Sequence, residues 1–243
     1  MSIRIRMTIV SIGMTFVCIA LLASAGPASA AESRAFTVSV SRHAKTRPLS
    51  DEQVRKILAE ASMILKKKDS AEDVACGITF TLSGHVGRFD SPTLGTDGFV
   101  RRDDLDAVHR VDESTDADLH VKVVVGIKEF CRFEGNNFIG CAYPPNFRSI
   151  IVFQPPEDLD VLGEPPTARA VAYYILWAHE FGHLMGLGHS EERNAVMSIC
   201  GLAPDQKVVT RHECNCYLSG PGFGPNGMCD LRGPVKSVRC SPN

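Results

Sequence analysis

Apolar positions along the chain follow two different spacings, one typical of helices and the other of strands. From Ser50 to Leu65 they recur at intervals of three and four residues, which predicts an amphipathic helix with Ser50 and Gln53 as reciprocal N-terminal caps. A second, longer helix is predicted over residues 167–184, beginning at Thr167. These two helices are the longest elements that the pattern predicts.

Five shorter segments have the apolar content of strands. They are residues 35–40, 77–82, 119–125, 139–143 and 149–153. In the third segment, apolar residues alternate with His120 and Lys122, which predicts a half-buried strand with these two side chains on its polar face. Residues 83–117 are rich in Gly and Asp and are expected to form a loop with a helical turn. The order of strand, helix, several strands and helix predicts a single α/β (α+β) domain built on one mixed sheet.

Composition and charge narrow the class of protein. The chain has 243 residues, of which 44% are hydrophobic and 22% charged, values close to those of globular proteins. Its 26 basic and 28 acidic residues give a formal net charge of −2. A protein that binds nucleic acid or an anionic membrane is expected to carry a strongly basic face. Nucleic-acid binding is therefore not expected.

The start of the chain has the three parts of a secretory signal peptide. Arg4 and Arg6 supply the basic region, residues 7–22 carry no charge, and Ala28 and Ala30 stand at the −3 and −1 positions of a cleavage site. A membrane anchor is the alternative, but the apolar run of about 16 residues is shorter than the ~20 that a bilayer-spanning helix needs. We therefore predict cleavage after Ala30 and a mature protein that is secreted or periplasmic, with no membrane segment.

Cysteine usage points to the same oxidising compartment. Eight of the nine cysteines lie beyond the signal segment, and this even number favours a set of disulfides. They are Cys76, Cys131, Cys141, Cys200, Cys214, Cys216, Cys229 and Cys240. A Cys131–Cys141 bond, which would close a short loop, is the one pairing that we predict. His212 with Cys214 and Cys216 could instead form a second metal site, but disulfides are the prediction in an oxidising compartment.

The end of the second predicted helix carries the pattern HExxHxxGxxH, from His179 to His189. Residues i and i+4 share a face of a helix, so His179 and His183 can direct both imidazoles at one zinc ion. Glu180 then lies beside the metal without needing to bind it. Gly186 lets the backbone adopt a left-handed conformation and turn sharply, so that His189 can supply a third nitrogen. Three protein ligands leave one position for water, which is typical of catalytic zinc sites.

A methionine follows this motif at a short distance. Met197 stands eight residues after His189, in the sequence NAVMS. The extended motif with this methionine resembles the metzincin clan of zinc peptidases, and the spacing is most similar to the matrixin-like branch. The resemblance implies a twisted mixed sheet, an active-site helix with the HExxH residues and a smaller C-terminal subdomain. It implies that Glu180 is the general base and that Met197 packs beneath the metal as the Met-turn. The implied zinc ligands are His179, His183 and His189.

The resemblance extends to a segment before the helix. The residues that resemble the substrate-binding edge strand of the matrixin-like branch are Gly140, Cys141, Ala142 and Tyr143. In that branch the strand pairs with the backbone of an extended peptide, so the same is implied here. The predicted organisation is a signal peptide over residues 1–30, a catalytic domain over 31–217 and a Gly-, Pro- and Cys-rich tail over 218–243.

Other candidate ligands have plainer interpretations. An Asp-rich segment could bind calcium, but it lacks EF-hand spacing and is predicted to be a solvated loop. Its residues are Asp90, Asp97, Asp103, Asp104 and Asp106. The remaining histidines are predicted to lie at the surface. They are His43, His85, His109, His120 and His212. Cys76 could cap the zinc, but because it borders a strand we predict a disulfide instead.

These features predict a secreted, monomeric zinc endopeptidase that acts on protein or peptide substrates. One catalytic zinc ion is the expected cofactor, and calcium has no support in the sequence. The alternative is a secreted zinc-binding interaction protein without peptidase activity. Glu180 argues against this alternative, because a protein that only binds has no need of a general base.

Overall fold

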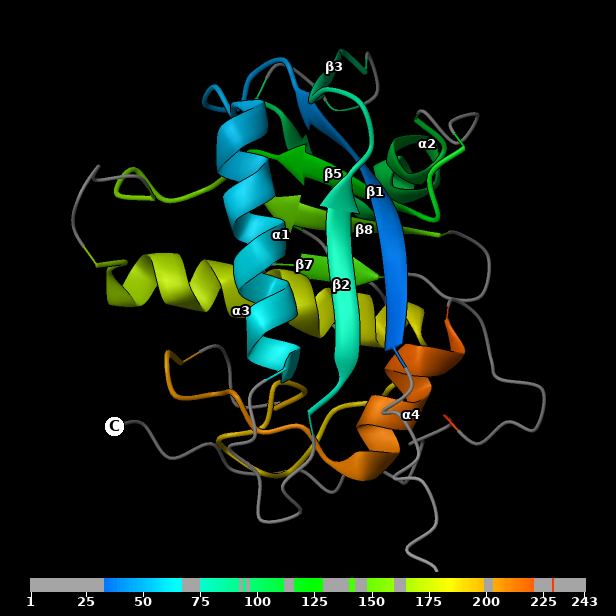
Figure 1. Cartoon of the computed structure of the whole chain (residues 1–243). Helices are drawn as coiled ribbons and strands as arrows, with labels where there is room; N and C mark the ends of the chain where they lie inside the picture. The colour runs from blue at the N-terminus through cyan, green and yellow to red at the C-terminus, as the bar shows by residue number, and fades with distance from the viewer. Residues whose placement is uncertain are drawn as a thin grey trace, which may run out of the picture. The chain divides into compact units, whose positions relative to one another are not determined.

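A computed structural model of the chain describes residues 33–66, 75–91, 94, 97–111, 116–128, 140–142, 148–159, 165–198, 203–220 and 229 (Figure 1). The described residues all belong to one compact unit within residues 31–243. The predicted signal peptide, Tyr143 and most of the predicted tail lie outside the described residues. In the part of the chain that is described, no helix has the length and apolar character needed to cross a membrane.

One mixed sheet forms the centre of this unit. Its strands run in the order β2, β1, β5, β8 and β7, all parallel except β7, which is antiparallel to β8. Their bounds are β1 Ser33–His43, β2 Gly77–Leu82, β5 Leu119–Val124, β7 Gly140–Ala142 and β8 Ser149–Phe153. Strand β3 (Gly87–Phe89) also pairs with β1, and β4 (Phe99–Val100) pairs with β6 (Gly126–Ile127). All five predicted strands and the mixed α/β class are confirmed.

Two long helices pack on one face of the sheet. Helix α1 (Asp51–Lys66) crosses α3 (Ala168–Leu184), and both contribute to the main hydrophobic core (Figure 1). The Ser50 backbone N–H donates to Gln53 Oε1 (2.8 Å), and the Gln53 N–H donates to Ser50 Oγ (3.1 Å). The Thr167 hydroxyl likewise accepts a hydrogen bond from the third residue of α3. Both helices therefore begin where the sequence predicts.

Helix α1 also covers one edge of the sheet. The Phe80 N–H of β2 donates to Ser62 Oγ of α1 at 2.9 Å, and the Ile78 N–H donates to the Cys76 carbonyl at 2.7 Å. These two donors point away from β1, because alternate residues of a strand direct their N–H groups to opposite sides. The outward N–H groups of Ile78 and Phe80 on this edge of β2 therefore already have hydrogen-bond partners.

Strand β5 differs from its prediction, because all six of its residues are buried. It lies between β1 and β8, and both faces of the sheet are covered there. His120 Nδ1 shares a hydrogen bond with Ser39 Oγ (2.6 Å), and Lys122 Nζ donates to Ser41 Oγ (3.3 Å) and to the carbonyl of Val111. The prediction of a half-buried β5 was wrong, because the polar side chains of His120 and Lys122 find hydrogen-bond partners inside the protein.

The cover on the second face comes from the segment that was predicted to be a loop. Residues 83–117 contain β3, β4, the 3-10 helix η2 (Arg102–Asp104) and helix α2 (Leu105–His109). Their apolar side chains form a second hydrophobic cluster with residues of β5 and β8. A helical turn was predicted correctly, but the short strands were missed because two- and three-residue strands leave no periodic signal.

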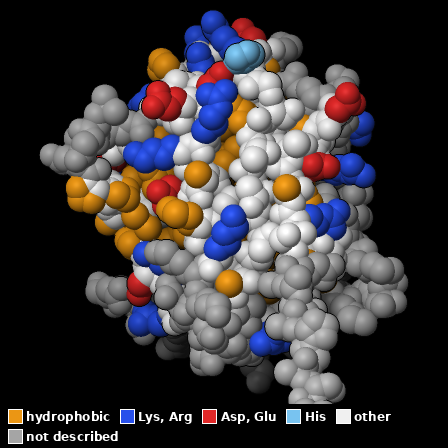
Figure 2. All heavy atoms as spheres, viewed as in Figure 1, with side chains coloured by type: hydrophobic (Ala, Val, Ile, Leu, Met, Phe, Trp, Pro, Cys, Tyr) orange, Lys and Arg blue, Asp and Glu red, His pale blue; other side chains and the backbone are white. Residues whose placement is uncertain are grey.

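Two further histidines are also buried, against the prediction of surface positions. His43 is 1% exposed and stacks edge-on against Phe89, and His109 is fully buried with its Nδ1 2.5 Å from Ser149 Oγ. The structure confirms exposed positions for His85 and His212. Lysine, arginine and acidic side chains are interspersed over the face drawn in Figure 2, in keeping with a net charge of −2.

Acidification is expected to destabilise the protein through His109. Burial, together with the nearby charge of Lys122, lowers the pKa of His109 to about 3. An unfolded chain protonates this ring at a pKa of about 6.5, so stability is lost as the pH falls from 6.5 toward 3. At pH 4.5 the loss amounts to about 3 kcal/mol. Urea unfolding measures the free energy of unfolding at pH 7 and at pH 4.5. Between these two pH values, His109→Gln should lose less of this free energy than the wild type, by about the amount given above. Equal losses in the two proteins would contradict the expectation.

Disulfides attach the C-terminal helix α4 (Arg211–Ser219) to the rest of the unit. Cys214 of α4 bonds to Cys76, which precedes β2, and Cys216 bonds to Cys229. Cys76, Cys214 and Cys216 are therefore neither a zinc cap nor part of a second metal site. Cys141 is disulfide-bonded as well. The predicted Cys131–Cys141 bond involves a residue outside the described part of the chain.

Candidate metal centre

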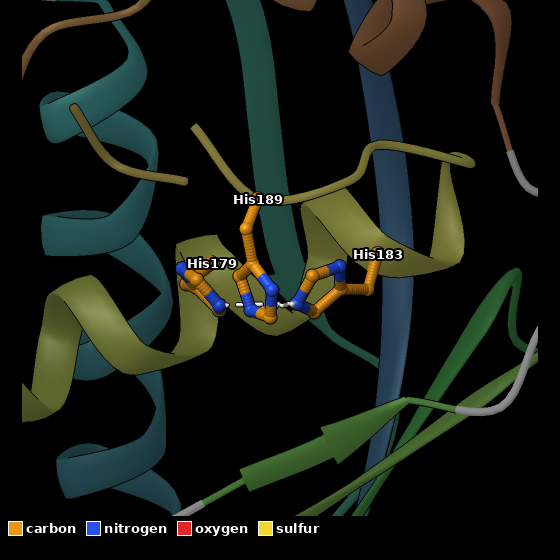
Figure 3. Close-up of side chains that lie close together, drawn as sticks. All are labelled: His179, His183 and His189. Carbon is orange, nitrogen blue, oxygen red and sulfur yellow. Dashed lines mark hydrogen bonds between the residues drawn. The ribbon is translucent and has the colours of Figure 1, made fainter. Parts of the chain in front are cut away.

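Three imidazoles converge at the C-terminal end of α3. His179 and His183 lie one turn apart on the helix, and His189 approaches from the segment that follows (Figure 3). The Nε2 of His183 is 3.0 Å from that of His179 and 3.2 Å from that of His189. Gly186 has a positive φ of 86°, and the chain reverses there to bring His189 back to the helix. The turn predicted at this glycine is confirmed.

The other ring nitrogens of the helical histidines are fixed by backbone carbonyls. His179 Nδ1 donates to the Val196 carbonyl at 2.7 Å, and His183 Nδ1 donates to the Leu187 carbonyl at 2.8 Å. Because each Nδ1 carries the proton, each Nε2 keeps its lone pair for a ligand bond. Burial lowers the pKa of His179 to about 4 and that of His183 well below its usual value. Neutral imidazoles are the form in which histidine binds metals.

This geometry fits a zinc ion. A tetrahedral ion with Zn–N bonds of 2.0–2.1 Å holds its ligand nitrogens about 3.3 Å apart, close to the separations found here. Among the described residues, the three histidines are the single group of His, Cys, Asp or Glu side chains whose ligand atoms gather in this way. They can therefore hold one zinc ion and leave a coordination position for water or substrate.

Glu180 lies beside the triad without joining it. The residue is 4% exposed, and among the described residues its Oε2 has no hydrogen-bond partner. Burial raises the pKa of this carboxyl to about 8. The side chain packs against Gly140 of β7, where an added Cβ would lie 2.7 Å from both Glu180 Cγ and Cδ. A divalent ion held by the adjacent histidines would favour the ionised form, in which the carboxylate is able to accept a proton from a reacting water.

Gly140→Ala is expected to displace the Glu180 carboxylate. The new methyl group would occupy the volume of the side chain, and a displacement of about 1 Å at a reacting group can lower turnover by about 10²-fold. The three imidazoles are untouched, so zinc content should remain at one per chain. Steady-state kinetics with a peptide substrate, together with metal analysis, measure both quantities. An unchanged kcat would show that the contact between Gly140 and Glu180 does not position the carboxylate.

The structure places Met197 directly behind the helix that carries the triad. Met197 is fully buried. It contacts Gly182, which lies between the two helical histidines, and a Cβ on Gly182 would come 3.1 Å from Met197 Cε. This position agrees with the packing role implied by the resemblance, which stays a prediction.

Strand β7 forms the end of the sheet opposite β2. Gly140, Cys141 and Ala142 pair with β8 on one side, and within the described residues no strand pairs with the other side. Tyr143, the fourth residue predicted to bind substrate, lies outside the described part of the chain. The role of Gly140, Cys141 and Ala142 in substrate binding stays a prediction.

The Asp-rich segment forms ion pairs and a cap. Asp97 accepts hydrogen bonds from Lys128 (2.7 Å) and Arg101 (2.9 Å), which hold the pKa of its carboxyl well below the usual range. Asp104 Oδ2 accepts from the Arg101 N–H, and Asp104 is buried. No set of acidic ligand atoms converges among the described residues, so a calcium site has no support there.

A comparison with protein families assigns this part of the chain. Residues 104–212 match the model of the matrixin family of peptidases. These residues form a matrixin domain. It includes the whole histidine triad, so the chain carries a matrixin-type metallopeptidase domain with an intact zinc-binding motif. The recognition made from HExxHxxGxxH and Met197 is confirmed.

The chain is also similar to several solved structures. Archaemetzincin from Methanopyrus kandleri is 17% identical with a TM-score of 0.44, and the match covers 79% of this chain and 91% of that one. A zinc-dependent peptidase from Methanocorpusculum labreanum is 18% identical with a TM-score of 0.44, covering 74% and 99%. Metalloproteinase-II from Bacteroides fragilis is 14% identical with a TM-score of 0.45, covering 79% and 54%. No curated protein matches the chain. The assignment of the matrixin domain rests on the family model and on the triad.

Proposed function

We propose that the protein is a secreted, monomeric zinc endopeptidase in which Glu180 acts as the general base. The observation that carries this proposal is the Glu180 carboxylate, which is buried, has no partner at Oε2 among the described residues, follows the first histidine of the triad and packs against Gly140 of the edge strand β7. The proposed ligands of one zinc ion are His179, His183 and His189. Zinc bound there supplies Lewis-acid activation of a water molecule and of the scissile carbonyl.

Glu180 then handles the proton that the reaction must move. Its carboxylate accepts a proton from the attacking water and passes it to the departing amine of the cleaved bond. The Nδ1 hydrogen bonds of His179 and His183 keep their rings oriented throughout, because both carbonyl partners belong to the folded backbone. Met197 packs against α3 behind the triad.

We propose that β7 binds the substrate. An extended peptide can add to the side of β7 that faces away from β8, pairing its backbone with Gly140 and Ala142. This edge lies against Glu180, so a peptide bound along it passes the carboxylate. Recognition through the backbone favours an internal bond of an unfolded or extended segment, which is the reason for proposing an endopeptidase. Tyr143 is included in this proposed strand.

We propose the domain limits and location that the sequence predicts. The signal peptide occupies residues 1–30, the catalytic domain 31–217 and the tail 218–243. Disulfides in the structure support an oxidising compartment outside the cytoplasm. N-terminal sequencing of the exported protein should give Ala31 as its first residue. A mature N-terminus that retains residues 7–22 would contradict cleavage and favour an anchor.

Peptide digestion tests the activity directly. The mature protein is incubated with a peptide library with and without a chelator, and cleavage sites are determined by mass spectrometry. We expect cuts at internal bonds that disappear with the chelator and return when zinc is added. Removal of terminal residues alone would contradict endopeptidase action. A protein that binds zinc stoichiometrically and cleaves no peptide would instead support the binding-only alternative.

A further inference from the structure

Helix α4 brings one tyrosine beneath the candidate metal centre. Tyr217 is fully buried, and its hydroxyl donates a 2.7 Å hydrogen bond to the carbonyl of Ala178. Ala178 is the residue immediately before His179 on α3. The carbonyl that receives this bond therefore belongs to the helical turn between the first two histidines of the triad.

The same hydroxyl also contacts Met197. It lies 3.6 Å from Met197 Sδ, and both groups occupy the space that Gly182 leaves open on α3. A Cβ on Gly182 would come 2.6 Å from the Tyr217 hydroxyl and would clash with Met197 Sδ. Glycine is unfavourable inside a helix by about 1 kcal/mol relative to alanine, so a glycine here is explained by this close approach.

Met197 in turn belongs to a segment whose carbonyls hydrogen-bond to His179 and to the residue after His189. The carbonyl of Val196 accepts the Nδ1 proton of His179, and the carbonyl of Met197 accepts from the Ser190 N–H at 2.6 Å. Ser190 directly follows His189. Tyr217 thus contacts both the helical turn that carries two of the imidazoles and the segment hydrogen-bonded around the first and third.

We propose that Tyr217 is a positioning residue for the metal centre, whose hydroxyl fixes the Ala178–Gly182 turn of α3 against Met197 and so orients the three imidazoles. It contacts neither substrate nor the ligand nitrogens. Groups that orient metal ligands from outside the coordination sphere commonly change metal affinity or enzyme activity by 10- to 100-fold. They do so because they fix the direction of the ligand lone pairs. The inference rests on the zinc site of the proposed function.

Tyr217→Phe tests the role, with Tyr173→Phe as a matched control. Each change removes a buried hydroxyl that donates to a backbone carbonyl and keeps the aromatic ring, since Tyr173 donates to the Phe153 carbonyl at 2.9 Å. Tyr173 lies on α3 before the histidines, where its hydroxyl bonds to β8 and its ring contacts Trp177 and Phe153. Loss of a hydrogen bond alone should therefore lower the thermal stability of both variants to a similar extent.

Metal binding and spectroscopy distinguish positioning from stability. We expect Tyr217→Phe to weaken zinc binding by about 10-fold or more in competition with a chromophoric chelator, and Tyr173→Phe to leave it unchanged. The visible absorption bands of the Co²⁺-substituted protein should shift in the first variant only. In peptide hydrolysis, kcat should fall with KM unchanged. Identical zinc affinity and cobalt spectra in the two variants would overturn the proposal.

A double-mutant cycle provides an independent measurement. Met197→Leu nearly conserves volume and removes the sulfur that Tyr217 contacts, so this variant should retain zinc. If Tyr217 acts through Met197, its replacement by Phe weakens zinc binding less in the Met197→Leu background than in the wild type. If the effects of the two substitutions on zinc binding are strictly additive, Tyr217 does not act through Met197. If the wild-type protein binds no zinc, the proposed function itself is refuted. If the wild type binds zinc and the variants behave alike, only the role of Tyr217 is refuted.

Discussion

Glu180→Ala is expected to give a folded protein that contains zinc and is nearly inactive. The substitution leaves all three imidazoles and both of their carbonyl partners in place, so zinc content should stay near one ion per chain. It removes the group proposed to transfer the proton, whose contribution to the rate is typically 10²–10⁴-fold. Peptide hydrolysis with metal analysis on the same sample measures both effects.

His183→Ala is the matched comparison, since it changes a ligand three residues along the same helix. With two imidazoles left, the metal should be lost along with the activity. The pair of variants therefore separates a base from a ligand. A wild-type rate in Glu180→Ala would show that the proposed mechanism is wrong. Loss of zinc as complete as in His183→Ala would make Glu180 a ligand or a support for the site.

Removal of the Cys76–Cys214 bond is expected to have the largest effect on stability. The bond closes a loop of 138 residues, which on the chain-entropy model contributes about 5 kcal/mol to the free energy of unfolding. The Cys216–Cys229 bond closes a loop of 13 residues and contributes about 3 kcal/mol on the same model. Most domains are stable by about 5–15 kcal/mol, so the first loss approaches the whole stability of a marginal protein.

Paired alanine variants allow the comparison to be made directly. Denaturant unfolding of Cys76→Ala/Cys214→Ala should show the larger loss, and Cys216→Ala/Cys229→Ala the smaller. Zinc content measured alongside shows whether detachment of α4 also affects the metal centre, as the position of Tyr217 leads us to expect. A larger loss from the short loop would contradict the expected order and indicate that local packing around α4 outweighs loop closure.

The elements that sequence patterns predicted correctly are those whose causes are local. Ser50 and Gln53 cap α1 through bonds within four residues, and the histidines of α3 share a face because of helical geometry alone. The turn at Gly186 likewise depends on the backbone freedom of a single residue. Such features need no knowledge of the tertiary structure, so the candidate metal centre could be found before the fold.

The errors concern residues whose surroundings come from distant parts of the chain. Burial of His120 and Lys122 depends on the two neighbouring strands and on the second hydrophobic cluster, and alternation within β5 carries no information about that cover. Tyr217 gave no signal either, because α4 reaches the metal centre through a disulfide to Cys76. Gly182 was the one available signal, since a glycine inside a strongly predicted helix indicates a close approach by another group.

The two ends of the sheet differ in a way that bears on aggregation. On β2, the outward N–H groups of Ile78 and Phe80 already donate hydrogen bonds, that of Phe80 to Ser62 of α1. Few donors remain on this edge for pairing with the backbone of an unfolded chain. Within the described structure, no strand pairs with the outer side of β7. If β7 binds extended peptides as proposed, a segment able to start an intermolecular sheet would add at the end of the sheet that lies against Glu180, and it would be cleaved there instead of accumulating.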